Sequence, residues 1–346
     1  MIHYALLLQE GEEHVTLGKM ALEYIGFLSF FAVYGALGFH FQVVKSLRSE
    51  HGVNIGGSAV DRADRRAGVI GLTGGLLMVV TLLVGLSQRA VQKHTTLMGV
   101  VSAGGPKQLF QIGCIALFVI CFALAAQRMR AAWVIAALTA IAYALRNITT
   151  GKWFSLVNPL HEVAASLWLG TLMVLLLAGI TSVLRVSQSG DERGQLVAEM
   201  VSRFSPLALV AAGLLGVTGV TTAWRHLKHL NSLWTTPYGY ALDAKLCVVV
   251  IVLLLGAWNW RRMKPQLGNE QAAFAIKRSA TAELSFAAVV LAITSLLVSL
   301  PSPRSSGPPS AGPGGGPPGA DAPEARAPRD GKRPTGETSG GSGGGN

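Results

Sequence analysis

Long apolar runs alternate with short polar segments over the first 300 residues of the chain. There are eight such runs, near residues 21–44, 67–88, 109–127, 131–147, 158–184, 204–224, 238–260 and 280–300. A bilayer core about 30 Å thick needs about 20 helical residues to cross it. The short fourth run is included because Trp133 and Tyr143 suit interfacial positions and arginines flank it. The pattern predicts an all-α, polytopic membrane helix bundle with about eight transmembrane helices.

Composition agrees with this class and excludes several others. Apolar residues make up 50% of the 346 residues and charged residues 14%, against about 25% charged residues in an average soluble protein. The net charge is +11, but the basic residues lie in loops and form no stripe, so no nucleic-acid partner is expected. Three cysteines, all inside apolar runs, are too few for a disulfide framework. Residues 1–20 do not form a signal peptide, so the first helix is expected to insert uncleaved.

The last 46 residues differ sharply from the rest of the chain. Residues 301–346 contain 13 glycines and 10 prolines and no aromatic residue. Such a segment buries too little surface to offset the entropy of ordering, so we expect a disordered tail. The predicted organisation is therefore an N-terminal four-helix half (1–150), a second four-helix half (151–300) and the tail.

The distribution of lysine and arginine among the loops predicts the orientation. The loops after the odd-numbered runs hold 15 of these residues, whereas the N-terminal segment and the other loops before the tail hold 8. Cytoplasmic loops carry the excess of positive charge. Both termini are therefore expected on the extracytoplasmic side, together with six of the eight histidines. His40 and His51 lie toward the cytoplasm.

His161 is the strongest candidate for a metal ligand. Asn158 and Pro159 read as an N-cap followed by proline at the first helical position, which places His161 in the first turn of the fifth helix. A helix N-terminus disfavours a protonated imidazole, and neutral imidazole binds copper, zinc, iron and nickel. Trp168 lies seven residues further along, two turns deeper on about the same face. The residues leave open a ligand role and a structural hydrogen bond for His161.

His226 and His229 are three residues apart at the outer end of the sixth helix. If that helix continues, the two side chains share a face and form a candidate bidentate metal site. Arg225 and Lys228 stand beside them, and these cations would weaken metal binding. The alternative is that this segment anchors the helix at the lipid headgroups.

Two ionisable residues lie within apolar runs of the second half. Lys245 is about 10 Å into the seventh helix at 1.5 Å per residue. An ionisable group at such a depth indicates either function or snorkelling toward the interface. Glu283 enters the eighth helix from the cytoplasmic side, where Lys277 and Arg278 are near enough for an interfacial ion pair.

Small residues recur at the spacing that favours close helix packing. Gly71 and Gly75 form a GxxxG pair in the second run, and Gly213, Gly216 and Gly219 line one side of the sixth. We interpret both sets as positions where helix backbones approach each other closely.

Four segments of the second half, in order, resemble those of one family. They are "LHEVAASLWLG" (160–170), "RFSPLALVAAGLLGVTG" (203–219), "TTPYGYALDAKL" (235–246) and "AELSFAAVVLAITSLLVSLP" (282–301). Together they resemble the copper resistance protein D (CopD) family of bacterial inner-membrane proteins, from about residue 158 to 301. The first 150 residues resemble that family only in layout.

The resemblance implies that the protein handles copper, moving the ion between periplasm and cytoplasm in the bacterial inner membrane. It carries over His161, Trp168, Tyr238, Gly239, Lys245 and Glu283 as site residues. The implied partners are copper ion, the lipid bilayer and a periplasmic copper-binding protein. No catalytic residue is expected, since the sequence contains no Walker A, GxSxG, HExxH or CxxC motif.

Two alternatives accompany this interpretation. The histidine helix and the segment containing Lys245 also resemble a membrane protoporphyrinogen oxidase family that binds b-type haem, which implies a haem-binding redox protein with His161 as an axial ligand. The third reading is a non-catalytic factor that delivers metal to a partner. An optical spectrum separates these readings, since a bound haem gives a Soret band.

Overall fold

The computed structural model describes residues 17–51, 57–148, 152–185, 190–226, 237–263 and 270–299, and every regular element within them is a helix. The first half contains α2 (Leu17–Gly38), η1 (Phe39–Val44), α3 (Lys45–His51), α4 (Gly57–Gln92), α5 (Leu97–Ala103), α6 (Gly105–Ala126) and α7 (Arg130–Leu145). The second half contains η2 (Trp153–Leu156), α8 (Val157–Ala165), η3 (Ser166–Gly170), α9 (Thr171–Val174), η4 (Leu175–Ile180), α10 (Thr181–Leu184), α11 (Gly190–His226), α13 (Pro237–Met263) and α14 (Glu270–Ser299). The predicted all-α class is confirmed.

Each of the eight apolar runs lies on helix in the structure. The first run lies within the continuous rod α2–η1–α3, and the fifth within the rod from η2 to α10. Within the described residues, six helical stretches are long and apolar enough to cross a membrane, while α7 is apolar but shorter. The protein is therefore a multi-pass membrane helix bundle, and the count of eight crossings remains a prediction.

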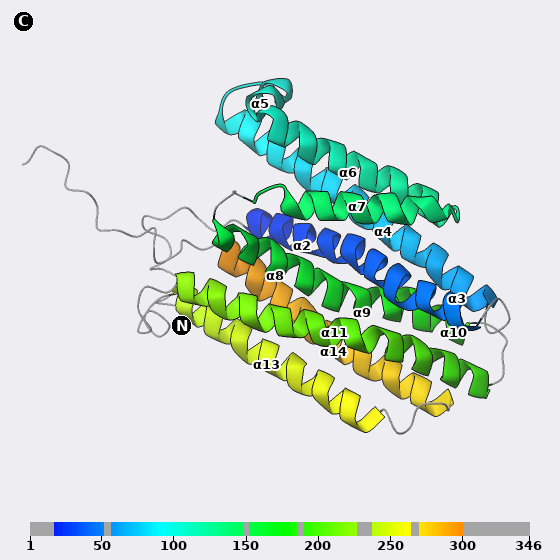
Figure 1. Cartoon of the computed structure of the whole chain (residues 1–346). Helices are drawn as coiled ribbons and strands as arrows, with labels where there is room; N and C mark the ends of the chain where they lie inside the picture. The colour runs from blue at the N-terminus through cyan, green and yellow to red at the C-terminus, as the bar shows by residue number, and fades with distance from the viewer. Residues whose placement is uncertain are drawn as a thin grey trace, which may run out of the picture. The chain divides into compact units, whose positions relative to one another are not determined.

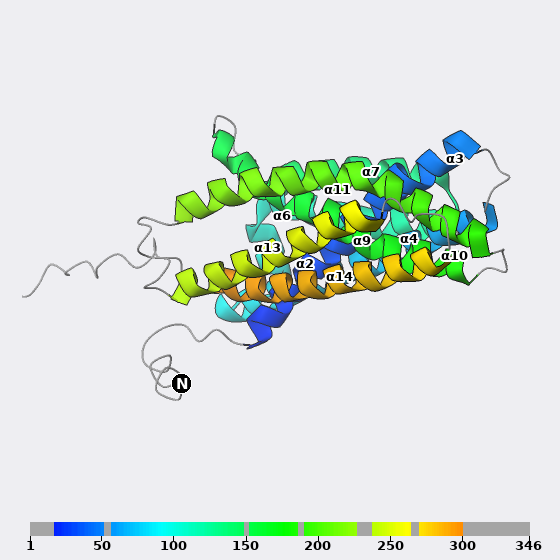
Figure 2. The ribbon, with the colours of Figure 1, turned by 90° about the horizontal axis from the view of Figure 1, so that it is seen from below.

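The helices run side by side, so that the bundle has two ends (Figures 1 and 2). The start of α8, the last turns of α11 and the start of α13 lie at one end, at the left of Figure 1, which we call the His161 end. The region of η1 and α3, the start of α11 and α10 lie at the opposite end, which we call the His40 end.

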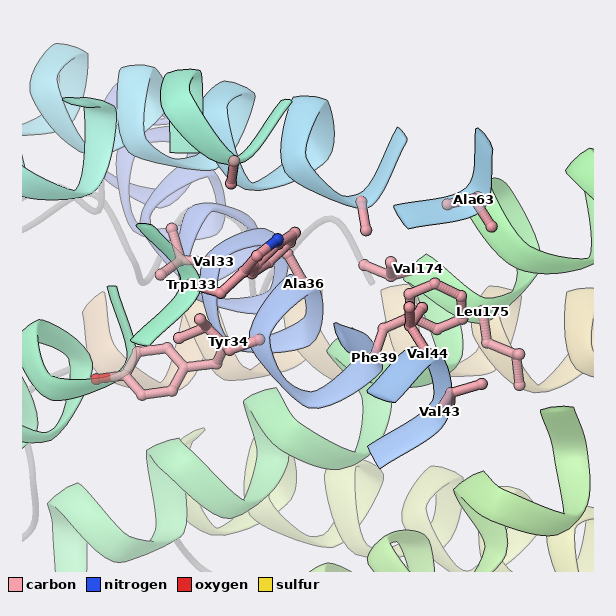
Figure 3. Close-up of a cluster of buried hydrophobic side chains, with 14 of the residues drawn as sticks. Val33, Tyr34, Ala36, Phe39, Val43, Val44, Ala63, Trp133, Val174 and Leu175 are labelled. Carbon is pink, nitrogen blue, oxygen red and sulfur yellow. The ribbon is translucent and has the colours of Figure 1, made fainter. Parts of the chain in front are cut away.

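Two rods form the centre of the bundle. In the span from Leu17 to Ser49 and in that from Phe154 to Leu184, 72% of the most apolar window is buried, against 17–33% in the other four spans. Figure 3 shows the core between them, where Tyr34 and Phe39 of the first rod lie near Trp133 of α7 and Leu175 of η4. The outer helices α6, α7 and α11 instead present large apolar side chains outward, as lipid contact requires.

The two central rods cross at a contact between glycines. A Cβ atom on Gly35 of α2 would collide with the backbone of Gly170 in η3, and one on Gly38 would collide with Thr171 Oγ1. Wide π-helical turns flank this crossing on both rods: η1 begins just after Gly38, and η3 ends at Gly170. The absence of side chains at both glycines lets the two backbones touch here.

The predicted packing glycines divide into two groups. The Gly71–Gly75 pair is confirmed, because α4 packs there on α6, with Phe122 beside Gly71 and Val119 beside Gly75. The packing role predicted for Gly213 and Gly216 is wrong, since nothing lies within 4 Å of a Cβ at either position. Gly213 and Gly216 are exposed on the outer face of α11, and neither contacts another helix within the described residues.

The N-terminal segment 1–16 and the tail predicted to be disordered (301–346) lie outside the described residues. The division into halves at residue 150 remains a prediction, and helices from both sides of it pack directly together, as α2 does with η3, α9 and α14.

Candidate functional site

His161 lies one turn further into its helix than the sequence predicted. The helix begins with the 3-10 turn η2 at Trp153 and continues as α8 from Val157, so Asn158 is inside the helix and is not its N-cap. Pro159 permits this because the N–H that proline lacks has no partner in a first helical turn. The argument that the helix N-terminus keeps His161 neutral is therefore weakened. The protonation state of the imidazole depends instead on the side chains around it.

The imidazole of His161 is held by a threonine of α11. His161 Nδ1 lies 2.9 Å from Thr218 Oγ1, and Thr218 is buried at 5% exposure. The Thr218 hydroxyl donates its proton to the carbonyl of Leu214 at 2.7 Å. With that proton donated to the carbonyl, the oxygen accepts from His161 in the tautomer that carries the ring proton on Nδ1 and leaves the lone pair of Nε2 free. A hydrogen bond of this kind at one ring nitrogen orients histidines that bind a metal through the other.

Gly219 lies beside this ring. A Cβ at Gly219 would lie 3.4 Å from His161 Cε1, which is an ordinary van der Waals contact, so the position does not require glycine. The prediction that helix backbones approach closely at Gly219 is wrong, because its nearest neighbour is the His161 side chain. Helices α8 and α11 pack along their length, as a shared site between them requires.

Lys245 is the charged neighbour of His161. It is half-buried in α13 and lies close enough to His161 for the two groups to interact electrostatically. This agrees with the predicted approach of Lys245 to the His161 helix. A cationic ammonium here opposes a metal ion at Nε2 and favours an anionic group, so the state of Lys245 decides what the site accepts.

The next residue, Glu162, belongs to a separate group of polar side chains. Its carboxyl group interacts electrostatically with Arg146, which follows α7, and with Glu23 of α2. The Arg146 guanidinium lies 3.7 Å from the centre of the Tyr143 ring. Glu162 is thus turned toward the first half of the bundle, and His161 toward α11.

The remaining predicted ligands lie at the edge of the described residues. α11 continues to His226, about 12 Å along the helix beyond Thr218 at 1.5 Å per residue, but its side chain is outside the described part. His229 lies wholly outside the described residues, and only the helical backbone is described at Tyr238 and Gly239. The predicted meeting of His161 with His226 or His229 remains a prediction.

Trp168 and Glu283 occupy the interior. Trp168 lies in η3 and packs partly buried between the main core and a smaller cluster that includes Phe31, Leu169 and Leu291. In a π-helix the hydrogen bonds join residues five apart, so each turn holds more residues than in an α-helix. The spacing of seven residues from His161 to Trp168 therefore no longer places both on the same face. Glu283 is 8% exposed, and α14 begins ten residues before the predicted run, at Glu270. Glu283 is thus about 20 Å along the helix, a buried acid rather than a residue of the first turn.

Thr218 is the site residue that sequence reasoning missed. It stood in the quoted "VTG" of the sixth run, but a threonine in an apolar run carries no sign of its partner 57 residues away. Among the described residues there is no group of three or more His, Cys, Asp or Glu that could hold a metal ion. The described site is therefore one imidazole with its positioning hydroxyl and a nearby ammonium.

Comparisons with known proteins agree with the resemblance found in the sequence. Residues 198–297 match the family model of copper resistance protein D, which confirms the predicted resemblance over most of α11, over α13 and over nearly all of α14. His161 and Trp168 precede the matched residues.

The copper transport protein CutJ of Bacillus subtilis (strain 168) is 33% identical to the chain over 149 residues. The match covers 43% of this chain and 25% of CutJ, so the chain spans about a quarter of that relative's length. No solved structure matches the chain.

Proposed function

We propose that this protein moves copper ions between the two sides of a bacterial inner membrane and that His161 binds the ion through Nε2. The multi-pass bundle, the match to copper resistance protein D and the likeness to CutJ support this class. The observation that carries the site is the hydrogen bond from His161 Nδ1 to Thr218, which leaves Nε2 as a free ligand atom.

The copper ion is the substrate, and the residues around it have separate roles. His161 supplies the ligand, and Thr218 fixes the tautomer and the ring orientation. One imidazole does not complete a copper site, so the second ligand in this proposal is His226 or His229. The His161 end faces the periplasm in the proposed orientation, where a periplasmic copper-binding protein delivers the ion.

Lys245 supports a second candidate function, the binding of b-type haem. A histidine with a hydrogen-bonded Nδ1 is a suitable axial ligand, and a lysine beside it suits a propionate. Copper binding instead requires Lys245 to be neutral or turned away. Haem would supply electron transfer, and the protein would then be a redox protein rather than a transporter.

Copper uptake by proteoliposomes tests the proposed function. The purified full chain is reconstituted and given copper sulfate, with and without ascorbate, while the lumenal copper is measured over time. We expect uptake well above that of protein-free liposomes, and its loss in His161→Gln. His94→Asn is the matched control, because His94 is an exposed histidine in a turn with a positive φ of 48°. Uptake equal to that of empty liposomes in the wild type, with copper still bound, would favour a delivery factor.

A further inference from the structure

A second ionisable cluster lies at the His40 end, opposite His161. His40 Nδ1 is 2.7 Å from Asp64 Oδ1, and Asp64 Oδ2 accepts a hydrogen bond from Arg48 Nη1 at 3.1 Å. Arg48 Nη2 in turn donates to Asp61 Oδ1 at 2.7 Å. The four groups come from η1, α3 and α4. Their contacts therefore link the rod α2–η1–α3 to α4 at this end.

Burial decreases steadily along this chain of contacts. The side chains of His40 and Asp64 are 9% and 13% exposed, whereas those of Arg48 and Asp61 are 32% and 42% exposed. His40 lies within a candidate membrane span and stacks flat on Trp133, with ring centres 4.2 Å apart and planes 7° apart. The cluster therefore leads from the surface of the bundle to a histidine in its interior.

Charge balance indicates what the buried histidine does. With neutral His40, one arginine faces two carboxylates and the cluster carries one uncompensated negative charge. A proton on His40 makes the cluster neutral, which is the less costly state for groups removed from water. The face of the Trp133 ring also attracts a cation. The environment thus offers a binding place for one proton.

The geometry also identifies the atom that takes the proton. An ionised carboxylate only accepts hydrogen bonds, so Asp64 fixes the proton of neutral His40 on Nδ1. The incoming proton binds the lone pair of Nε2, and its loss restores the neutral ring. No other reactant is needed for this step.

The other charged side chains near η1 that the structure describes are already engaged or lie further out. On α3, Lys45 Nζ lies 5.8 Å from the centre of the Phe41 ring. On α11, Arg203 binds Ser46 Oγ at 3.1 Å and Glu199 at 3.2 Å. On α4, Arg66 reaches Ser182 while Arg62 and Arg65 are exposed, and on α7 Arg130 is exposed. The charged residues of α2 in the described chain, Lys19 and Glu23, lie at the other end.

A mechanical connection links this cluster to the His161 helix. His40 is two residues after Gly38 and five after Gly35, which touch Thr171 and Gly170 on the second central rod. Gly170 and His161 belong to the same rod, nine residues apart. Because these contacts are so close, a displacement of η1 would be transmitted to the rod that carries the proposed copper ligand.

We propose that the His40–Asp64 pair is a proton-binding site and that its loading and unloading couples a proton gradient to copper movement. This inference rests on the proposed function for its second half. Its first half, the proton site itself, stands independently of copper. The pair then has the role that buried histidine–carboxylate pairs take in membrane proteins that move protons.

Tryptophan fluorescence of the purified full chain tests the proton site without copper. Protonated imidazole quenches a stacked indole, so the fluorescence of the wild type should change when the pH is varied. The change should disappear in His40→Gln and in Trp133→Phe, and it should persist in the His94→Asn control. A change that persists in His40→Gln would overturn the inference, whatever the copper data show.

Copper movement in proteoliposomes tests the coupling. For one proton per copper ion, a pH difference of one unit should change the final copper ratio across the wild-type membrane about tenfold. His40→Gln should still bind copper at His161 but should not respond to the pH difference. An equal response in His40→Gln would refute the coupling. A wild type that moves no copper would refute the proposed function, and the fluorescence titration would still decide the proton site.

Discussion

Replacing Thr218 by valine removes the group that orients His161 while it keeps the shape of the helix interface. Valine has nearly the volume of threonine but offers no acceptor to Nδ1. The His161 ring then loses its 2.9 Å contact, and neither its tautomer nor its orientation is fixed. We expect the copper affinity of the variant to fall, because Nε2 is no longer held as the free ligand atom.

The size of the effect depends on separating the contact of Thr218 with His161 from the hydrogen bonds that Thr218 makes to its own helix. One is the bond from its hydroxyl to the Leu214 carbonyl at 2.7 Å, and Thr221 makes the same kind of bond to the Val217 carbonyl at 2.8 Å. Thr221→Val therefore removes an equivalent backbone bond and leaves His161 untouched. Loss of an outer-shell partner of a metal ligand costs about 10–100-fold in affinity, or about 1.4–2.7 kcal/mol.

Competition with a copper chelator, on detergent-purified protein at fixed pH, measures both variants. Thr218→Val should bind copper at least about 10-fold more weakly than Thr221→Val, and Thr218→Ser should restore the affinity. Equal affinities of the two valine variants would show that Thr218 does not act through His161 and that the tautomer argument is wrong.

Three further predictions concern packing, orientation and Lys245. Gly35→Ala should lower the midpoint of thermal unfolding in detergent, because its Cβ meets the Gly170 backbone and overpacking costs about 1–3 kcal/mol. Gly213→Ala should leave the midpoint unchanged, since nothing lies within 4 Å of a Cβ there. Equal midpoints of the two variants would contradict the close crossing at Gly35. A reporter that is active only in the cytoplasm should be inactive when it is fused after residue 305, and an active fusion would reverse the orientation. Lys245→Met should abolish a haem spectrum, or else impair copper handling with no haem signal at any stage. Unchanged copper tolerance, metal content and spectrum in that variant would make Lys245 a snorkelling anchor.

The helices were predictable because the bilayer imposes a strong and simple pattern. Runs of apolar residues located all eight helical regions, and the Gly71–Gly75 spacing correctly indicated a close contact between α4 and α6. The helix starts were less predictable, since the polar turns that extend a helix beyond the apolar region carry no hydropathy signal. Both α4 and α14 begin about ten residues before their apolar runs for this reason.

Contacts between distant segments could not be predicted from one sequence. Nothing in the chain indicates that Thr218 binds His161 or that Gly35 touches Gly170, because these pairs are set by how whole helices cross. The π-helical segments were also invisible, since the sequences of η1 and η3 are ordinary apolar helix sequences. His40 was placed only by the side of the membrane that it faces, and its contacts with Asp64 and Trp133 emerged from the structure.

Metal content measured together with the optical spectrum tests the central claim most directly. The full chain is purified in detergent after growth with copper and a haem precursor, and wild type is compared with His161→Gln and His94→Asn. The account predicts bound copper in the wild type and in His94→Asn, its loss in His161→Gln, and no Soret band in any of them. A Soret band that disappears in His161→Gln, or copper that remains in that variant, would contradict it.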